Sequence, residues 1–370
     1  MTFRRIALWT VIAVPVVILA AGGIAYARST NSCYTGPPSA PVHPMKAATY
    51  CDYGSADVLR MSDVEKPAPG DDQVLVKVRA AAVNPLYWHY MRGTPYIMRL
   101  GAGLRKPNVI RLGVDFAGTV EAVGKNVTQF KPGDDVFGGR TGAFAEYVVV
   151  GQDKDIAHKP ANVTFEQAAS VPIAAITALQ GVRDAARVQP GQRVLINGAS
   201  GGVGTFMVQI AKRYGATVTG VCSGKHADMV KSIGADEVID YTKADYTKGV
   251  QRYDVIIDNV GNRSLSENRR VLTPKGKYVQ IGGGGPSDGK WLGPLGRVAS
   301  TYVYSRFVIQ DFGMMLANLT QPDLKALADL MQTGKMTPVI DRTYPFKDLP
   351  AAIKYLEEGH AAGKVVVTFE

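Results

Sequence analysis

Short apolar runs separated by Gly, Pro and Asp turns dominate the chain from about residue 45 to residue 159. The runs at 74–78 and 145–150 are typical of strands, because β-branched and aromatic residues recur between turn residues. From about Thr164 the pattern changes to helical periods alternating with apolar strands, which indicates βαβ units and a parallel sheet. We expect the strands of this second region at 193–197, 217–222, 237–240, 254–258 and 277–281.

The last part of the chain, from about Leu316, mixes helices with one strand. A helix, a Thr-Pro turn and a second helix around 351–357 precede a closing strand at 364–369. No internal repeat or low-complexity tract is found. These patterns predict the α/β class, with a mostly-β domain, a parallel sheet flanked by helices and an apolar helix at the N-terminus.

An uncharged, mostly apolar run spans residues 6–27. As a helix it would reach about 33 Å, which matches the hydrocarbon core of a bilayer. A cleaved signal peptide is the alternative, because Arg4 and Arg5 precede the run and Ala25-Tyr26-Ala27 has the form of a cleavage site. The run is longer than a typical signal core, which favours an anchor, and a buried helix is a third option. We expect a membrane protein with a single N-terminal pass, or an exported protein if the signal is cleaved.

Composition narrows the function classes. Hydrophobic residues make up 46% of the 370 residues and charged residues 20%, which fits a globular protein. The formal net charge is +10, but beyond the N-terminus the basic residues are scattered among acids, so we expect no nucleic-acid partner. Cys33, Cys51 and Cys222 form no Cys-x-x-Cys pair, which argues against structural zinc or a redox dithiol. A Cys33–Cys51 bridge is an option if the protein is exported.

The strongest local signal is a glycine-rich loop between the strand expected at 193–197 and a helix expected at 205–214. A strand that turns through glycines into a helix N-terminus binds a pyrophosphate through free N–H donors and the helix dipole. The usual first glycine is Ala199 here, so the turn has to accept a Cβ. A purely structural turn is the alternative, but a second strand about 15 residues on favours a dinucleotide site. We expect the cofactor to contact Ser200, Gly201, Gly202, Val203 and Gly204.

Cofactor preference depends on the turn after that second strand. An NAD site places Asp or Glu there, about 20 residues past the motif, to bind the ribose 2′-hydroxyl. The turn reads Ser223-Gly224-Lys225-His226 and contains no acid. A carboxylate would repel a 2′-phosphate, whereas a hydroxyl and an ammonium bind it, so we predict NADPH held by Ser223 and Lys225. A solvated turn that accepts both cofactors is the alternative.

The expected cofactor conflicts with the expected anchor. The basic residues before the apolar run outweigh the one after it, so the positive-inside rule would send the enzyme across the membrane. NADPH is an intracellular metabolite. The orientation therefore stays open.

The run from Gly191 to Lys212 reads Gly-Gln-x-x-Leu-x-x-x-Ala-Ser-Gly-Gly-x-Gly-x-x-x-x-Gln-x-x-Lys. It resembles the signature of the quinone oxidoreductase/zeta-crystallin branch of the medium-chain dehydrogenases/reductases. Further matching landmarks lie at 82–85, 112–118, 131–138, 142–147 and 363–366. The resemblance extends from about residue 45 to the end of the chain.

This resemblance implies a domain layout. A GroES-like, mostly-β catalytic domain would span 45–165 and be completed by 316–370. It would enclose a Rossmann NADPH-binding domain, a doubly wound parallel sheet, at 166–315. Residues 1–28 would form the transmembrane anchor or signal segment and 29–44 a linker. Dimers are common in this family, so a homodimer is one option.

The resemblance also predicts whether the chain binds zinc. Relatives that use zinc have Cys where this chain has Asn84, and Gly-His-Glu where it has Gly113-Val114-Asp115. Neutral Asn and Val cannot replace thiolate and imidazole as ligands, and three cysteines cannot supply a four-cysteine structural site. We therefore expect no zinc. Without a Lewis acid, hydride transfer to a quinone or enone is favoured, because the charge delocalises over a conjugated system.

Further site residues follow from the resemblance. It places Asn84 on the substrate side. The residues expected to flank the nicotinamide are Thr177, Asn259, Gly261 and Ile281. Tyr241 would lie near the adenosine phosphate, and Lys364 would contact the cofactor from the closing segment. Tyr87 stands in a stretch where relatives often carry Asp, and its hydroxyl is suited to donate to a carbonyl oxygen. The alternative is that Tyr87, His89 and Tyr90 only pack at the cleft edge, so Asn84 and Tyr87 are catalytic candidates and no firm acid is assigned.

Three functions fit the sequence. We predict an NADPH-dependent oxidoreductase that transfers hydride to a quinone, an enone or a similar activated carbonyl acceptor. The first alternative is a nucleotide-binding redox sensor or accessory subunit with little turnover. The second is an NAD(P)-dependent alcohol dehydrogenase.

Overall fold

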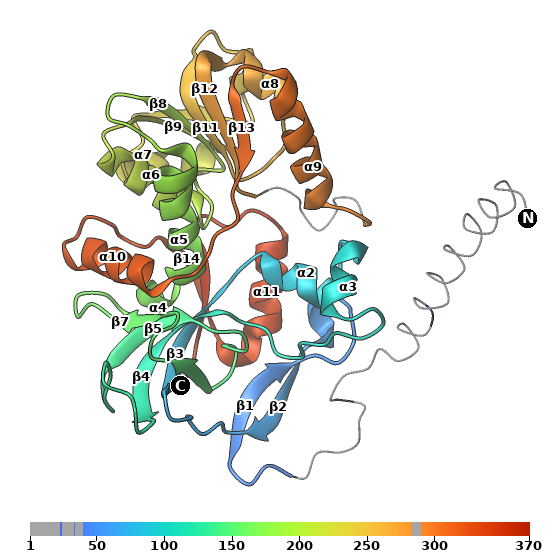
Figure 1. Ribbon diagram of the computed structural model, residues 1–370, viewed down its shortest axis with the longest axis vertical. Coiled ribbons are helices and arrows are strands. Elements are labelled where there is room, and N and C mark those ends of the chain that lie inside the picture. The colour runs from blue at the N-terminus through green and yellow to red at the C-terminus, as the bar shows by residue number, and fades with distance from the viewer. Residues whose placement is uncertain (1–22, 24–32, 34–39, 283–289) are drawn as a thin grey trace, which may run out of the picture.

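The computed structural model describes residues 23, 33, 40–282 and 290–370, and two large sheets organise them (Figure 1). The seven-stranded sheet has the order β14-β15-β3-β4-β5-β7, with β6 paired to β3. The six-stranded sheet has the order β10-β9-β8-β11-β12-β13, and all of its pairs are parallel. The α/β class is confirmed.

The seven-stranded sheet unites the early strands with the end of the chain. Its members are β3 (Gln73–Val83), β4 (Asp115–Val123), β5 (Asp135–Gly139), β6 (Tyr147–Gly151), β7 (Ile156–His158), β14 (Ile340–Pro345) and β15 (Lys364–Thr368). A separate hairpin pairs β1 (Pro44–Thr49) with β2 (Arg60–Glu65). Strand β15 pairs antiparallel with β3, so the closing segment lies inside the sheet that the early strands begin.

Strand β3 is buried on both of its faces. Successive side chains of a strand point to opposite faces. Ala80 and Ala82 accordingly join the core beneath the six-stranded sheet, whereas Ala81 and Val83 join the core of the other sheet. The small alanines let helices approach β3 closely, and this strand couples the two halves of the molecule.

The six-stranded sheet follows the predicted βαβ pattern. Its strands are β8 (Arg193–Asn197), β9 (Thr217–Cys222), β10 (Glu237–Asp240), β11 (Tyr253–Asp258), β12 (Leu272–Gln280) and β13 (Asp311–Met314). The first three coincide with the predicted strands, and β12 begins five residues before the predicted 277. Strand β13 was not predicted, because a four-residue run containing Gly313 carries no strand pattern. The strand order reverses between β8 and β11, and ligands of open α/β sheets bind at such a switch point.

Helices cover the sheets and fill the junction between them (Figure 1). They are α2 (Leu86–Arg92), α3 (Arg99–Ala102), α4 (Phe165–Ala169), α5 (Pro172–Gln180), α6 (Gly204–Arg213), α7 (Ala227–Ser232), α8 (Leu265–Arg270), α9 (Pro294–Tyr304), α10 (Gln321–Gln332) and α11 (Leu349–Glu357). Short helical turns lie at η1 (Ala56–Val58), η2 (Tyr96–Met98), η3 (Gly181–Ala186), η4 (Gly224–His226), η5 (Tyr246–Lys248), η6 (Ser305–Phe307) and η7 (Phe346–Asp348). Helix α5 begins with proline at its first turn, where no backbone donor is lost, and is almost wholly buried.

The expected membrane localisation needs correction. Within 40–282 and 290–370, no helix combines the length and the apolar character that a bilayer crossing requires. The apolar helix predicted at 6–27 lies outside the described residues except for Gly23, as does most of the predicted linker. The predicted domain boundaries and the homodimer stay predictions.

A disulfide joins Cys33 to Cys51, just after β1, with their Cα atoms 5.9 Å apart. The bridge that the sequence offered as an option is therefore present. Cys222 is the free cysteine and is buried, which raises the pKa of its thiol to about 11.

Thiol titration tests this disulfide. We expect one thiol per chain, Cys222, to react after unfolding without a reductant, and three to react after reduction. In the folded protein Cys222 should react slowly, because burial keeps it protonated and inaccessible. Three reactive thiols in the unreduced, unfolded protein would show that the bridge does not form.

Candidate active site

A tight loop connects β8 to α6 at the switch point of the six-stranded sheet. Gly198 has a φ of +79°, a left-handed conformation that favours glycine, and its N–H donates to Val221 O at 3.1 Å. A Cβ at Gly204 would lie 2.0 Å from Gly198 O, so the start of α6 has no room for a side chain. Gly201 has only that same oxygen nearby, at 3.5 Å. The loop therefore leaves open space at the N-terminus of a ten-residue helix.

Ala199 stands where loops of this kind usually have their first glycine. Its side chain is buried, and the facing strand β9 makes room for it at Gly220, where a Cβ would lie 3.0 Å from Ala199 Cβ. Ala199 N still donates to Val221 O at 3.0 Å. The loop tolerates the extra methyl group because β9 supplies the space.

The turn after β9 carries the residues that we predicted to select the cofactor. Ser223 Oγ lies 3.3 Å from His226 Nδ1, and Lys225 is exposed between them. Tyr241 follows β10 and is 49% exposed. A hydroxyl, an ammonium, an imidazole and a phenol thus converge at one end of the cleft.

An acid also packs against this turn, which the sequence did not reveal. A Cβ at Gly224 would lie 2.4 Å from Asp240 Oδ2, so Asp240, the last residue of β10, lies under the turn. Its carboxylate accepts from the hydroxyl and the N–H of Thr242 at 2.7 and 3.0 Å, and these bonds hold the pKa of Asp240 below its usual range. Asp240 does not line the cavity.

Strand register places three polar side chains together at the other end of the cleft. Val83 pairs with Val365 and Ala81 pairs with Phe116. Asn84, directly after β3, therefore lies between the first residues of β15 and β4. These two residues are Lys364 and Asp115. A bridge between Gly201 and Gly363 also joins this sheet to the glycine loop.

The three side chains form a buried network. Lys364 Nζ donates to Asn84 Oδ1 at 2.6 Å and lies 3.6 Å from Asp115 Oδ2. Asn84 Nδ2 donates to the same Asp115 oxygen at 3.0 Å, and Ile173 N donates to the other at 3.0 Å. Burial raises the pKa of Asp115 and lowers that of Lys364, and the opposite charge of each partner works against these shifts. Lys364 also packs on the loop, because a Cβ at Gly202 would lie 2.9 Å from its Cδ.

Tyr87 supports this network from α2. Its hydroxyl accepts from Val114 N at 2.6 Å and from Asn84 Nδ2 at 3.1 Å. The side chain is 2% exposed, and burial followed by the charge of Asp115 raises its pKa. Tyr87 is absent from the residues that line the cavity. The structure therefore places its hydroxyl behind Asn84 and Val114, within the wall.

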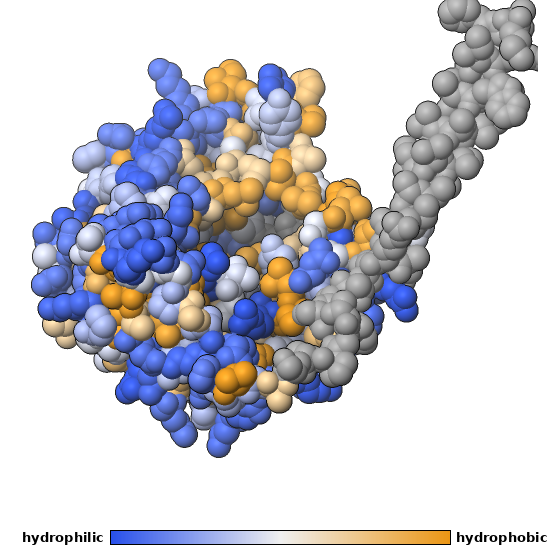
Figure 2. All heavy atoms as spheres, turned by 60° about the horizontal axis from the view of Figure 1, so that its bottom comes forward, coloured by the Kyte–Doolittle hydropathy of each residue, from blue (hydrophilic) through white to orange (hydrophobic). Residues whose placement is uncertain are grey.

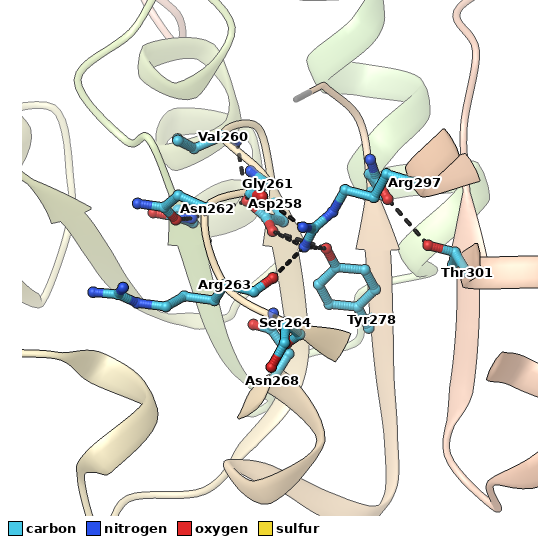
Figure 3. Close-up of polar contacts among 12 residues, drawn as sticks. Asp258, Val260, Gly261, Asn262, Arg263, Ser264, Asn268, Tyr278, Arg297 and Thr301 are labelled. Atoms are coloured by element: carbon cyan, nitrogen blue, oxygen red, sulfur yellow. Dashed lines mark hydrogen bonds and ion pairs between the residues drawn. The ribbon is translucent and has the colours of Figure 1, made fainter. Parts of the chain in front are cut away.

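The opposite wall is built on Asp258, the last residue of β11 (Figure 3). Its fully buried carboxylate accepts from Tyr278 OH at 2.8 Å and from Asn197 Nδ2 at 2.9 Å. The N–H of Gly261 donates to it at 2.8 Å, which fixes the loop after β11. Arg297 of α9 lies 3.5 Å from Asp258 and donates to the carbonyls of Gly261 and Arg263. One carboxylate thus anchors a strand end, a loop and a helix.

A cavity of about 500 Å³ lies between these walls. Of the predicted residues, those in its lining are Asn84, Ser200, Gly201, Gly202, Val203, Gly204, Ser223, Lys225, Tyr241, Asn259 and Lys364. The lining does not include Tyr87, Thr177, Gly261 or Ile281. Thr177 instead donates to Ile173 O at 2.6 Å within α5, and Gly261 bonds to Asp258. Figure 2 shows one face of the molecule hollowed, with apolar side chains around the hollow.

The residues present fit a dinucleotide. The loop is open over Gly201, at a helix N-terminus that favours phosphate. Asn259 donates to Asn197 O at 3.1 Å, but its buried Oδ1 has no partner among the described residues. Buried polar atoms are nearly always paired, so this amide oxygen needs a donor. The carboxamide N–H of a nicotinamide is a donor of the right kind.

Known proteins match most of this chain. The alcohol dehydrogenase GroES-like domain matches residues 70–161, and the zinc-binding dehydrogenase family matches residues 233–367. The 2-methylene-furan-3-one reductase of Solanum lycopersicum is 36% identical over 340 residues, which cover 87% of this chain and 79% of the relative. The quinone oxidoreductase of Homo sapiens is 31% identical over 339 residues, which cover 87% and 97%. The solved quinone oxidoreductase from Coxiella burnetii is 28% identical with a TM-score of 0.77, covering 88% of this chain and 100% of that one.

The chain belongs to the quinone oxidoreductase branch of the medium-chain dehydrogenases/reductases. It is an NAD(P)H-dependent oxidoreductase, like the NAD(P)H oxidoreductase RTN4IP1 of Mus musculus, 33% identical over 85% of this chain and 87% of the relative. The family resemblance read from the sequence is confirmed. The seven-stranded sheet is the core of the GroES-like domain, and the six-stranded sheet is the Rossmann sheet.

Several residues of this oxidoreductase site were missed in the sequence. Asp115 was considered only as part of a lost zinc motif, although it holds Lys364 and Asn84. Asp258 and Arg297 carry no motif, and only the fold brings them together. His226 and His360 also line the cavity, and nothing in their spacing showed that they meet.

A double-mutant cycle tests the buried pair. Asp115→Asn and Lys364→Met should each lower the free energy of unfolding by about 3 kcal/mol, because each leaves a buried group without its charged partner. The double variant should lose less than the sum, by about 1 kcal/mol or more, since neither charge is then stranded. Urea unfolding measures all four proteins. Strictly additive losses would mean that the two groups do not interact.

Proposed function

We propose that this chain uses NADPH to reduce a quinone or an α,β-unsaturated carbonyl compound. The observation that carries the proposal is the single cavity that joins the glycine loop, the Ser223–Lys225 turn and the Asn84–Lys364 network. When bound, the nicotinamide cofactor supplies the hydride. The names of relatives support the acceptor class: they include quinone oxidoreductase and an NADPH-dependent alkenal/one oxidoreductase from Arabidopsis thaliana, 35% identical over 338 residues.

The preference for NADPH rests on charge at the turn after β9. Lys225 places a positive charge, and Ser223 a hydroxyl, at the end of the cavity that would hold the adenosine ribose. Tyr241 adds a second hydroxyl. Asp240 carries a negative charge beside this turn, but its carboxylate accepts from Thr242 and does not line the cavity. A 2′-phosphate is therefore attracted at this position.

The donor set supports chemistry without zinc. Zinc sites in proteins use thiolate, imidazole and carboxylate ligands. The amide of Asn84 accepts from Lys364 and donates to Asp115 and Tyr87. The side chain of Val114 is an alkyl group and has no atom that binds a metal. Among the described residues, no group of three or more His, Cys, Asp or Glu is arranged to hold a metal ion.

Lys364 and Asn84 are the polar groups of the wall that faces the acceptor. Reduction of an enone or quinone develops negative charge on a carbonyl oxygen, which fixed donors stabilise. The charge of Asp115 favours the protonated form of the buried Lys364 amine and so opposes the lowering of its pKa by burial. We assign Lys364 to polarising the acceptor, Asn84 to holding the Lys364 amine in place, and Tyr87 to holding Asn84.

An acceptor panel tests the activity. The purified protein with NADPH should lose NADPH absorbance in the presence of quinones or enones, and a chelator should leave the rate unchanged. Absence of turnover with every quinone and enone, while NADPH still binds, would favour the sensor or accessory role. Oxidation of simple alcohols that is abolished by a chelator would favour the alcohol dehydrogenase.

A charge reversal tests cofactor selection. Lys225→Glu should raise the Kd for NADPH by about tenfold or more, because a carboxylate then faces the 2′-phosphate, and should leave the Kd for NADH nearly unchanged. Fluorescence titration measures both constants. Lys231→Glu, an equal charge change at an exposed site of α7 outside the cavity lining, is the matched control. Equal NADPH affinity of Lys225→Glu and the native protein would contradict the assignment.

A further inference from the structure

Two of the five histidines lie in the lining of the cofactor cavity, and neither has a role in the site described above. His226 ends the turn η4 in the Rossmann sheet region. His360 follows α11, in the segment that completes the GroES-like sheet. The two imidazoles therefore reach the same end of the cavity from different halves of the molecule.

Their position coincides with the residues that would bind the 2′-phosphate. His226 Nδ1 lies 3.3 Å from Ser223 Oγ and follows Lys225 directly in the chain. His226 is half-buried, whereas His360 is exposed. An imidazole that gains a proton offers two N–H donors and a positive charge, which are the features that bind a phosphate group.

The surroundings favour the neutral form of the His226 imidazole in the empty site. Burial lowers its pKa below the usual 6.5, and the charges of Lys225 and His360 lower it further. Asp341, at the start of β14, acts in the opposite direction. The remaining groups at this end add no positive charge: Asp240 is a carboxylate that accepts from Thr242, Tyr241 is a phenol and the Cys222 thiol is protonated.

We propose that His226, assisted by His360, is a proton-linked ligand for the 2′-phosphate, so that binding of NADPH, but not of NADH, takes up a proton. The proposal rests on the proposed use of NADPH. A 2′-phosphate carries a charge of about −1.5 to −2 near neutral pH. An opposite charge within a few ångströms raises a histidine pKa by about 1–3 units. His226 would then be neutral in the empty site and protonated beside the phosphate.

The direction of the pH effect follows from linkage. When the bound state holds one more proton than the free state, affinity falls as pH rises through the pKa of the bound state. NADPH should therefore bind more weakly at higher pH, whereas NADH should show no such trend. The phosphate itself gains a proton below about pH 6, so the effect is sought above that pH. Selectivity for NADPH over NADH should be highest in slightly acidic solution.

Isothermal titration calorimetry of the full chain tests the proposal without turnover. Titrations in buffers of different ionisation enthalpy should show uptake of about 0.5–1 proton per NADPH at neutral pH, and none per NADH. The Kd for NADPH should rise by about threefold to tenfold between about pH 6.5 and about pH 8. The redox-inert 2′-phospho-ADP-ribose should show the same uptake, which places the effect at the adenosine end.

Substitutions assign the proton. His226→Gln should abolish most of the uptake and flatten the pH dependence of the NADPH Kd, while leaving NADH binding unchanged. His226→Arg, which carries a permanent charge, should keep tight NADPH binding at both pH values. His360→Gln should reduce the uptake in part. His43→Gln, at an exposed histidine outside the cavity, is the control and should behave like the native protein.

The outcomes separate this proposal from the proposed function. Tight NADPH binding with no proton uptake, or with the same uptake in His226→Gln as in the native protein, would overturn the role of the histidines and leave the use of NADPH intact. Equal affinity of the native protein for NADPH and NADH at all pH values would overturn both. Thermal unfolding of each variant checks that the change is confined to the site.

Discussion

The buried contact of Lys364 with Asp115 and Asn84 is the interaction on which the site depends. It joins the end of β3, the start of β4 and the start of β15, and the backbone of the residue before Lys364 bridges to the glycine loop. Taking two charges out of water costs several kcal/mol per ion, and their attraction with added hydrogen bonds only offsets this. The pair therefore matters more for the relative placement of these segments than for the stability of the fold, because it forms only when the segments occupy their native positions.

A second carboxylate holds the other wall in the same manner. Asp258, like Asp115, is fully buried, accepts backbone N–H donors and faces a cation from a distant helix or strand, here Arg297. Both walls are thus fixed before any ligand binds. A cofactor that enters a preorganised cleft does not have to order its loops, and this removes a part of the entropy cost of binding.

Sequence patterns predicted the parts of this structure that depend on local chemistry. Strands β8, β9 and β10 and the glycine loop were found because apolar runs and glycines leave a readable pattern. Strand β13 was missed because four residues carry too little periodicity. Asp258 and Arg297 were missed because the fold alone brings them together. Ala199, in place of the usual glycine, adds a Cβ to the loop, and the sequence does not show where this atom fits. The space is supplied by Gly220 on β9, which is seen only when β8 and β9 are paired.

Burial explains why the two ends of the cleft behave differently. At the Lys364 end the amine and the carboxylate of Asp115 are paired with each other and enclosed by the protein. At the adenosine end the histidines border solvent, and Lys225 is exposed. A half-buried imidazole between a lysine and an incoming phosphate changes its charge at little cost, because its ordinary pKa lies near neutral pH. The same cleft therefore has an enclosed, ion-paired group at one end and partly exposed, titratable groups at the other.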